Sequence, residues 1–265
     1  MPKANTAILK YLKDQGRKID IPLNDLRQFQ EFEKTVQAAM KSYDHLPPTV
    51  AFGMRSFHKI EMLGIALIMS GDYPAAQRCL DDVMKRFNSD SAFTDGVTLL
   101  AWVLFNFPIR PNGNTVASEV LRQSPDLAAE LSLFVDALNR SRLGLYEVIH
   151  DARETCKIKE LFTGTEVTLN QTLGGVKRGN IAVVRVIKLM DQYWSFGDTN
   201  EFPAERRTTI ENMVADKMDV YFPAKHPAKS YELMMRLAGP YWFSVVAHDF
   251  DSDILNTDHY LSYYD

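Results

Sequence analysis

Hydrophobic residues recur every three to four positions along the first half of the chain, which is the spacing that places them on one face of an α-helix. Leu26, Phe29 and Phe32 show this spacing in one of the clearest stretches. Prolines and glycines, such as Pro47 and Gly71, interrupt the pattern and separate the helices. The predicted helices are residues 5–15, 22–46 or 24–46, 49–69, 73–87, 93–107, 115–122 and 126–142.

The pattern changes to a period of two between residues 143 and 203, where β-branched and aromatic residues are frequent. The nearly continuous apolar run at 181–189 predicts a buried strand, and residues 190–192 predict a tight connection. Five short antiparallel strands within about sixty residues predict a small barrel or a curled sheet. The predicted strands are residues 145–150, 156–162, 166–169, 181–189 and 193–196.

Helical spacing returns after Pro203, over 205–220 and 229–237. Residues 241–247 fit either a strand or a buried helix, because periodicity does not separate the two. We therefore predict an α+β protein. Its parts are an all-helical, repeat-like domain over 1–142, a small antiparallel β barrel over 143–203, and a helical C-terminal cap with an acidic tail over 204–265.

Composition narrows the classes of function. The 265 residues are 46% hydrophobic and 24% charged, which is typical of a soluble globular protein. A net charge of −4 argues against a polybasic coat on DNA or on a membrane. Two distant cysteines, Cys79 and Cys156, and the lack of a signal peptide predict reduced thiols and a cytoplasmic location. No apolar run approaches the ~20 residues that span a bilayer, so no membrane association is expected.

One segment of the helical half has the form of a known repeat. The pattern Gly-x-Tyr-x-x-Ala-x-x-x-Leu-x-x-Val over 71–83 resembles the middle of a tetratricopeptide repeat, and Gly64 fits the preceding small position. No second copy occurs at the period of about 34 residues. The segment therefore predicts either a tight helix hairpin or a concave helical face that holds a segment of a partner.

A wider resemblance covers about residues 100 to 203. The blocks that carry it are Ala-Trp-Val-Leu-Phe-Asn at 101–106, Gly-Asn-Thr at 113–115, Glu-Val-Leu at 119–121, Leu-x-x-Ser-x-x-Gly-Leu-Tyr-Glu-Val at 138–148, Lys-Glu-Leu-Phe-Thr-Gly-Thr-Glu-Val at 159–167 and Arg-Gly-Asn-Ile-Ala-Val-Val-Arg-Val at 178–186. This region resembles the one that precedes the zinc-binding tail in bacterial proteins with a SEC-C motif.

The resemblance to SEC-C proteins implies a fold and a bacterial or phage origin, and it brings no reaction with it. Asn106 and Asn180 stand where the family pattern has acids. The cysteine-rich metal tail of the family is also missing from this sequence, so a zinc ion is not carried over.

The predicted barrel supports a nucleic-acid-binding hypothesis, because small barrels stack bases on exposed aromatic side chains while basic side chains contact phosphate. Strand alternation places Tyr193 and Trp194 on opposite faces, however. Aromatic side chains that fill the core, and lysines that protect a strand edge, are the alternative interpretation. The candidate residues are Lys177, Arg178, Arg185, Tyr193 and Trp194, with Lys157, Lys159, Lys188 and Phe196 as further members.

The acidic C-terminal stretch is the candidate metal site. Four acids and two histidines fall within residues 248–259. Hard cations bind several carboxylates, and transition metals accept imidazole together with carboxylate. The candidate ligands for a divalent metal are His248, Asp249, Asp251 and His259. The glycine and glutamate of an EF-hand are missing, so the alternative is a solvated acidic tail.

The chain shows neither a phosphate-binding loop nor a Gly-x-Ser-x-Gly elbow. Cys156 and His150 would face one another only if no turn separated them, and residues 151–155 have the composition of a turn. Catalytic residues are therefore unknown, and a protein that is not an enzyme is favoured. We predict a cytoplasmic protein that acts through a protein partner. The alternatives are nucleic-acid binding by the barrel and a metal-dependent hydrolase at the C-terminal cluster.

Overall fold

The computed structural model describes residues 23–46, 48–89, 96–109, 113–221, 231–232 and 234–236. The chain divides into two compact units, one formed by Met1–Asp82 and Val103–Val135 and the other by Val83–Trp102 and Asp136–Asp265. The first is called the helical unit and the second the barrel unit. The described helices are α2 (Leu23–Ser42), η1 (Tyr43–His45), α3 (Pro48–Met69), α4 (Pro74–Ser89), α5 (Gly96–Phe105), α6 (Val116–Arg122), α7 (Pro125–Arg140), η2 (Ala204–Arg206) and α8 (Arg207–Tyr221).

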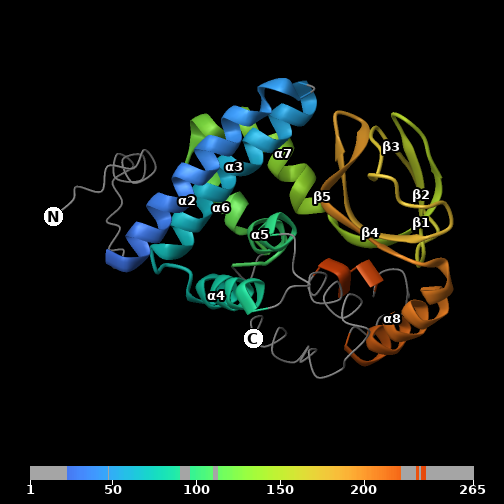
Figure 1. Ribbon diagram of the computed structural model, residues 1–265. Helices are drawn as coiled ribbons and strands as arrows, with labels where there is room; N and C mark the ends of the chain where they lie inside the picture. The colour runs from blue at the N-terminus through green and yellow to red at the C-terminus, as the bar shows by residue number, and fades with distance from the viewer. Residues whose placement is uncertain are drawn as a thin grey trace. The chain divides into compact units, whose positions relative to one another are not determined.

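The predicted α+β fold class is confirmed, because helices accompany a closed five-stranded barrel within the described residues (Figure 1). The strands are β1 (Arg142–Asp151), β2 (Cys156–Glu160), β3 (Glu166–Leu169), β4 (Ile181–Leu189) and β5 (Gln192–Phe202). The predicted helices over 22–142 correspond to α2 through α7 with ends shifted by a few residues. The predicted helix 5–15 lies outside the described residues. The three-part division and the repeat-like character remain predictions.

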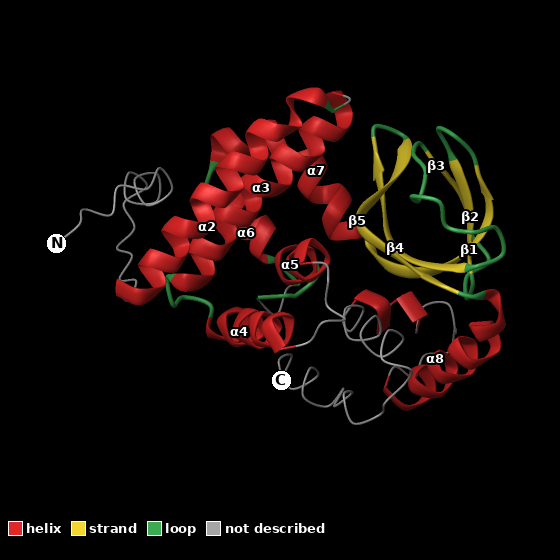
Figure 2. Cartoon of the chain, viewed as in Figure 1, coloured by secondary structure: helices red, strands yellow, loops and turns green. Residues whose placement is uncertain are grey.

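The strand order around the barrel is β1-β2-β3-β5-β4, and Figure 2 shows these strands in yellow. The pairs β1–β2, β1–β4, β2–β3 and β4–β5 are antiparallel, as predicted. The β3–β5 contact that closes the barrel is parallel and joins Leu169 to Tyr193. This order closes the five strands into a barrel, which leaves no free strand edge. Such barrels carry many unrelated functions, so function has to be argued from the site.

β4 is almost entirely hydrophobic because both of its faces, like those of β1, are covered by other parts of the barrel unit. One face turns into the barrel, where Val148, Ile158 and Val184 pack together. The opposite face packs against α8, where Ile210 and Val214 are fully buried. A strand covered on both faces has no solvent side on which polar residues are favoured. The apolar stripe predicted for the helix after Pro203 is confirmed by this packing.

A two-residue turn joins β4 to β5, which confirms the tight connection predicted at 190–192. Met190 and Asp191 both have positive φ angles, 52° and 62°. Hairpin turns with two positive φ angles usually contain Asn, Asp or Gly, so Met190 is the strained residue of this turn. It lets β5 start at Gln192, and the strand extends to Phe202, well beyond the predicted end at 196.

Described residues also extend past α8. Residues 231–232 and 234–236 are helical, within the helix predicted at 229–237. The segment predicted at 241–247 lies outside the described residues. Every helix in the described part of the chain is too short or too polar to cross a lipid bilayer.

The turn between α3 and α4 contains Gly71 at φ 84°, a conformation that favours glycine. Gly64, seven residues earlier, lies where α3 approaches its neighbours. A Cβ at this position would stand 2.6 Å from Leu104 Cδ2 and 3.1 Å from Val116 Cγ1. The small residue therefore permits close packing, as the resemblance to a tetratricopeptide repeat implied, although the relation to that family stays a prediction.

Replacing Gly64 by alanine should destabilise the helical unit by about 1–3 kcal/mol, because the added methyl group overpacks a closed contact. Gly53→Ala on the same helix is the matched control. Its new Cβ would meet Phe134 at an ordinary 3.7 Å, so the better helix propensity of alanine should leave stability unchanged or raised. Urea unfolding of both variants tests this expectation, and equal effects would contradict it.

Candidate functional site

A pocket of about 530 Å³ opens at one end of the barrel, and we call it the barrel-mouth pocket. Its volume falls within the range of small-ligand sites. The strands reach it at their ends, because Arg142 begins β1, Glu160 ends β2 and Tyr193 lies near the start of β5. Its lining residues are Arg140, Ser141, Arg142, Tyr146, Glu160, Thr165, Val167, Val186, Tyr193, Glu232 and Arg236.

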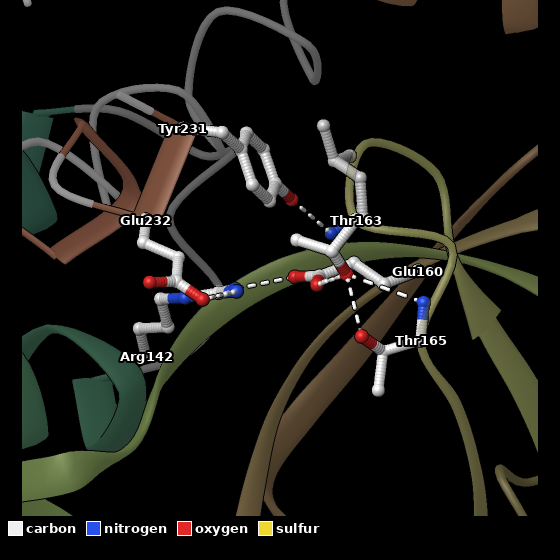
Figure 3. Close-up of polar contacts among 7 residues, drawn as sticks. Arg142, Glu160, Thr163, Thr165, Tyr231 and Glu232 are labelled. Carbon is white, nitrogen blue, oxygen red and sulfur yellow. Dashed lines mark hydrogen bonds and ion pairs between the residues drawn. The ribbon is translucent and has the colours of Figure 1, made fainter. Parts of the chain in front are cut away.

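An ion pair between Arg142 and Glu160 lies in the lining of the pocket (Figure 3). Both side chains are largely buried, at 17% and 4% exposed. The other oxygen of Glu160 accepts a hydrogen bond from the Thr163 hydroxyl, and the Thr163 hydroxyl in turn lies 3.0 Å from that of Thr165. Each carboxylate oxygen therefore has a partner, which is the condition under which a buried charge pair persists.

Electrostatics keep Arg142 charged and two neighbouring tyrosines neutral near neutral pH. Burial disfavours the charged form of Arg142, but the hydrogen bond and charge of Glu160 outweigh it, so the pKa of Arg142 is raised. Burial, followed by the charge of Glu160, raises the pKa of Tyr146. Burial also raises the pKa of Tyr231. Arg142 is thus a permanent cation between two neutral phenols.

Tyr231 fixes the short C-terminal helical segment to the barrel. The backbone N–H of Leu145 donates to the Tyr231 hydroxyl at 3.0 Å, and the Tyr231 ring stacks on Phe162 with centroids 4.5 Å apart. The Arg142 guanidinium lies 5.1 Å from the centroid of the Tyr231 ring. This docking brings the next residue, Glu232, to 3.8 Å from Arg142 Nη2 (Figure 3).

The pocket combines cationic groups with an apolar wall. Arg140 is 79% exposed, and its one ion pair with a described residue is with Asp136 of its own helix, a type of surface pair that contributes little. Arg236 is exposed, and no described residue forms an ion pair with it. Its backbone oxygen accepts a hydrogen bond from Trp102 Nε1 at 3.0 Å, which fixes its backbone. The apolar wall consists of Tyr146, Val167, Val186 and Tyr193, which belong to or pack on the inner barrel cluster.

The residues predicted to bind nucleic acid do not form one surface. Lys177 and Arg178 are exposed in the connection between β3 and β4. Arg185 is 1% exposed and donates to the Ser141 hydroxyl at 3.0 Å, so its assignment as a phosphate contact is corrected. Tyr193 packs against the inner barrel cluster, whereas Trp194 pairs with Ile187 on the opposite face.

The further candidates of the barrel are also partly occupied. Lys157 forms an ion pair with Glu166 at 2.7 Å. Lys188 pairs with Asp191 at 3.2 Å and lies 5.9 Å from the centroid of the Tyr193 ring. Lys159 is half-buried, and Phe196 is buried and cannot stack on a base. Lys157 and Lys188 are therefore engaged with neighbouring side chains of the barrel, which fits the alternative interpretation that these lysines are structural.

The candidate metal ligands His248, Asp249, Asp251 and His259 lie outside the described residues, so the metal site stays a prediction. Within the described ranges, no group of three histidine, cysteine or acidic side chains could hold a metal ion.

The Cys156–His150 pair has no support as a catalytic dyad. Cys156 is buried opposite Asp151, whereas His150 is exposed and pairs in register with Lys157. Burial, together with Asp151, raises the pKa of the Cys156 thiol to about 12. A thiol held in its neutral form is a poor nucleophile.

Sequence reasoning missed Arg142, Glu160, Glu232 and Arg236. The available signal was a charged residue at the first position of one strand and another at the last position of the next, which a hairpin brings together. No protein-family model, curated protein or solved structure matches the chain.

Proposed function

We propose that the protein is an interaction module that binds an acidic segment of a protein partner in the barrel-mouth pocket. The observation that carries the proposal is the placement of two exposed arginines, Arg140 and Arg236, around a third, Arg142, that is fixed in position. The two buried, free thiols, Cys79 and Cys156, support a reducing compartment and hence a cytoplasmic location.

Arginine is well suited to this role. Its planar guanidinium forms paired hydrogen bonds with a carboxylate, which adds geometric selectivity to charge attraction. Glu160 holds Arg142 by Nη1, and Arg142 Nη2 lies 3.8 Å from Glu232 at the pocket. Arg140 is held by a weak surface ion pair, and no described residue forms an ion pair with Arg236. An entering carboxylate can therefore gain hydrogen bonds without breaking a buried ion pair.

The apolar wall adds a second requirement for the ligand. Val167, Val186 and Tyr193 line the same pocket as the arginines. An apolar side chain next to the acidic one would be removed from water against this wall, which contributes about 25 cal/mol per Å² of apolar area. The favoured ligand is thus a peptide in which acidic and apolar residues alternate.

Charge favours a protein partner over nucleic acid. Binding to a phosphate backbone needs a track of cations with few neighbouring acids. Glu160 and Glu232 lie within the pocket, and Glu166 holds Lys157 on the β2–β3 surface. The aromatic residues Tyr193 and Trp194 also occupy different faces of the barrel.

A fluorescence anisotropy titration tests the proposal with a labelled peptide of alternating glutamate and leucine. Its glutamine-for-glutamate counterpart and a single-stranded thymidine oligonucleotide serve as probes of the alternatives. We expect the acidic peptide to bind best. The R140A/R236A double variant should lose at least about tenfold in affinity, the equivalent of one charged hydrogen bond.

The matched control is K157A/K159A, which removes two cations from β2 outside the pocket lining and should leave peptide affinity unchanged. Tighter binding of the oligonucleotide than of the peptide, abolished in K157A/K159A, would overturn the proposal in favour of nucleic-acid binding. If neither double variant loses affinity for the peptide, the peptide binds elsewhere on the protein.

A further inference from the structure

The helical unit contains a hydrogen-bonded chain of three side chains that the proposed function does not use. The Tyr43 hydroxyl lies 2.7 Å from His58 Nε2, and His58 Nδ1 lies 2.5 Å from Glu61 Oε2. His58 and Glu61 are one helical turn apart on α3 and are 8% and 3% exposed. Tyr43 comes from η1 and stacks parallel to the imidazole, with centroids 5.7 Å apart.

The chemistry of the three groups assigns the protons. An ionised carboxylate only accepts hydrogen bonds, so His58 carries its proton on Nδ1 and donates it to Glu61. Nε2 is then a bare acceptor, and the Tyr43 hydroxyl donates to it. A hydroxyl, an imidazole base and a carboxylate that orients the base form the arrangement by which enzymes activate a nucleophile.

A pocket of about 440 Å³ lies beside this chain, and Tyr43 is one of its lining residues. Ser56, Arg55 and Lys59 are also among the residues that line it. Arg55 pairs with Asp44 and Lys59 with Glu130, and these partly exposed pairs are weak enough to exchange for an anionic ligand. The volume suits a small molecule.

The resting state of Tyr43 is the neutral phenol. Burial, followed by the negative charge of Glu61, raises the pKa of Tyr43. The oxygen therefore needs a base to remove its proton as it attacks, and His58 is already hydrogen-bonded to that proton.

We infer that Tyr43 is a base-assisted nucleophile that accepts an acyl group from a small ester with an anionic substituent. Tyr43 Oη forms a bond to the carbonyl carbon, and its proton moves to His58 Nε2. The bond from that carbon to the leaving oxygen breaks, and His58 returns the proton to the leaving group. Glu61 is a positioning residue that orients the imidazole and stabilises its cation. Arg55 and Lys59 attract the anionic substituent. This inference is independent of binding at the barrel mouth.

The test uses p-nitrophenyl acetate and 4-acetoxybenzoate, an ester with an anionic substituent, on the full-length protein. Mass spectrometry of proteolytic peptides measures acetylation at each tyrosine. We expect Tyr43 to be acetylated at least about tenfold faster than the half-buried Tyr193, below the hundredfold typical of general-base assistance because these esters are unoptimised substrates. The anionic ester should show the larger ratio.

Variants separate chemistry from architecture. His58→Gln removes the base, and E61Q keeps a hydrogen bond to the imidazole while removing the charge. Both should lower the Tyr43 rate while the Tyr193 rate stays constant, with folding checked by circular dichroism. If the three hydrogen-bonded side chains only stabilise the fold, the two substitutions will change the melting temperature and leave the ratio of the Tyr43 and Tyr193 rates unchanged. The inference is overturned if Tyr43 in the native protein reacts no faster than Tyr193, whatever the variants do.

Discussion

Glu160→Ala should lower the free energy of unfolding by about 3 kcal/mol, the largest stability effect we expect in the barrel unit. The substitution leaves the guanidinium of Arg142 largely buried without its carboxylate partner, and breaking a buried pair from one side typically costs 3–5 kcal/mol. It also removes the acceptor of the Thr163 hydroxyl. The measurement is urea unfolding at pH 7 followed by circular dichroism.

The matched control is Glu166→Ala, which removes an ion pair with Lys157 on the same β2–β3 hairpin. Both of those side chains are roughly half exposed, so the loss should stay below about 1 kcal/mol. Equal destabilisation by the two substitutions would show that burial does not distinguish the pairs, and the role given to Arg142 and Glu160 would then be wrong.

The second large effect is a pH dependence centred on Glu119 in the helical unit. The side chain is fully buried and accepts hydrogen bonds from Tyr73 at 2.8 Å, from Arg122 and from Gln123. The hydrogen bond from Arg122 is the largest influence, and the pKa of Glu119 falls to about 2. A glutamate in an unfolded chain titrates near 4.3.

The sign of the effect follows from this lowered pKa. Stability that depends on ionised Glu119 is complete above about pH 5 and is lost as the pH falls toward 2. The difference corresponds to about 2 kcal/mol after allowance for solvent screening at the exposed Arg122. Glu119→Gln should therefore be less stable than the native protein at pH 7, and the gap should shrink steadily between pH 5 and pH 2.5.

Urea unfolding of the two proteins across this pH range provides the measurement, since other carboxylates titrate equally in both. A gap that stays constant from pH 7 to pH 2.5 would mean that the carboxylate charge of Glu119 does not stabilise the fold.

Much of the fold follows from local sequence pattern. The apolar spacing of α3 and the unbroken apolar run of β4 each reflect which faces are covered, and that information is written along the chain. The turn at Met190 was predicted because two strand-forming runs stand on either side of it. Its positive φ angles are imposed by the strands and not by the residue types.

Contacts between distant segments were harder to predict. Arg185 is surrounded by strand-forming residues in the sequence, and its assignment as a phosphate contact required an exposed side chain. In the structure it is buried and bonded to Ser141, 44 residues earlier. Likewise, the docking of Tyr231 on Leu145 joins residues 86 apart, and no local periodicity encodes it.

The Tyr43–His58–Glu61 chain had one readable signal. His58 and Glu61 belong to a polar group in the mostly apolar α3, and they are three residues apart and therefore on one face. Two polar side chains on a buried helix face require partners, so the pattern predicts a hydrogen-bonded pair. The third member, Tyr43, comes from a separate element and needed the structure.

A charge-reversal experiment tests whether an acidic segment of a partner binds at the barrel mouth. The variant R140E/R236E reverses both exposed cations of the rim, while the Arg142–Glu160 pair stays intact. Anisotropy titrations would compare labelled peptides of alternating glutamate and leucine or lysine and leucine. We expect the native protein to prefer the glutamate peptide and the variant to prefer the lysine peptide. An unchanged preference for the glutamate peptide in a folded variant would contradict it.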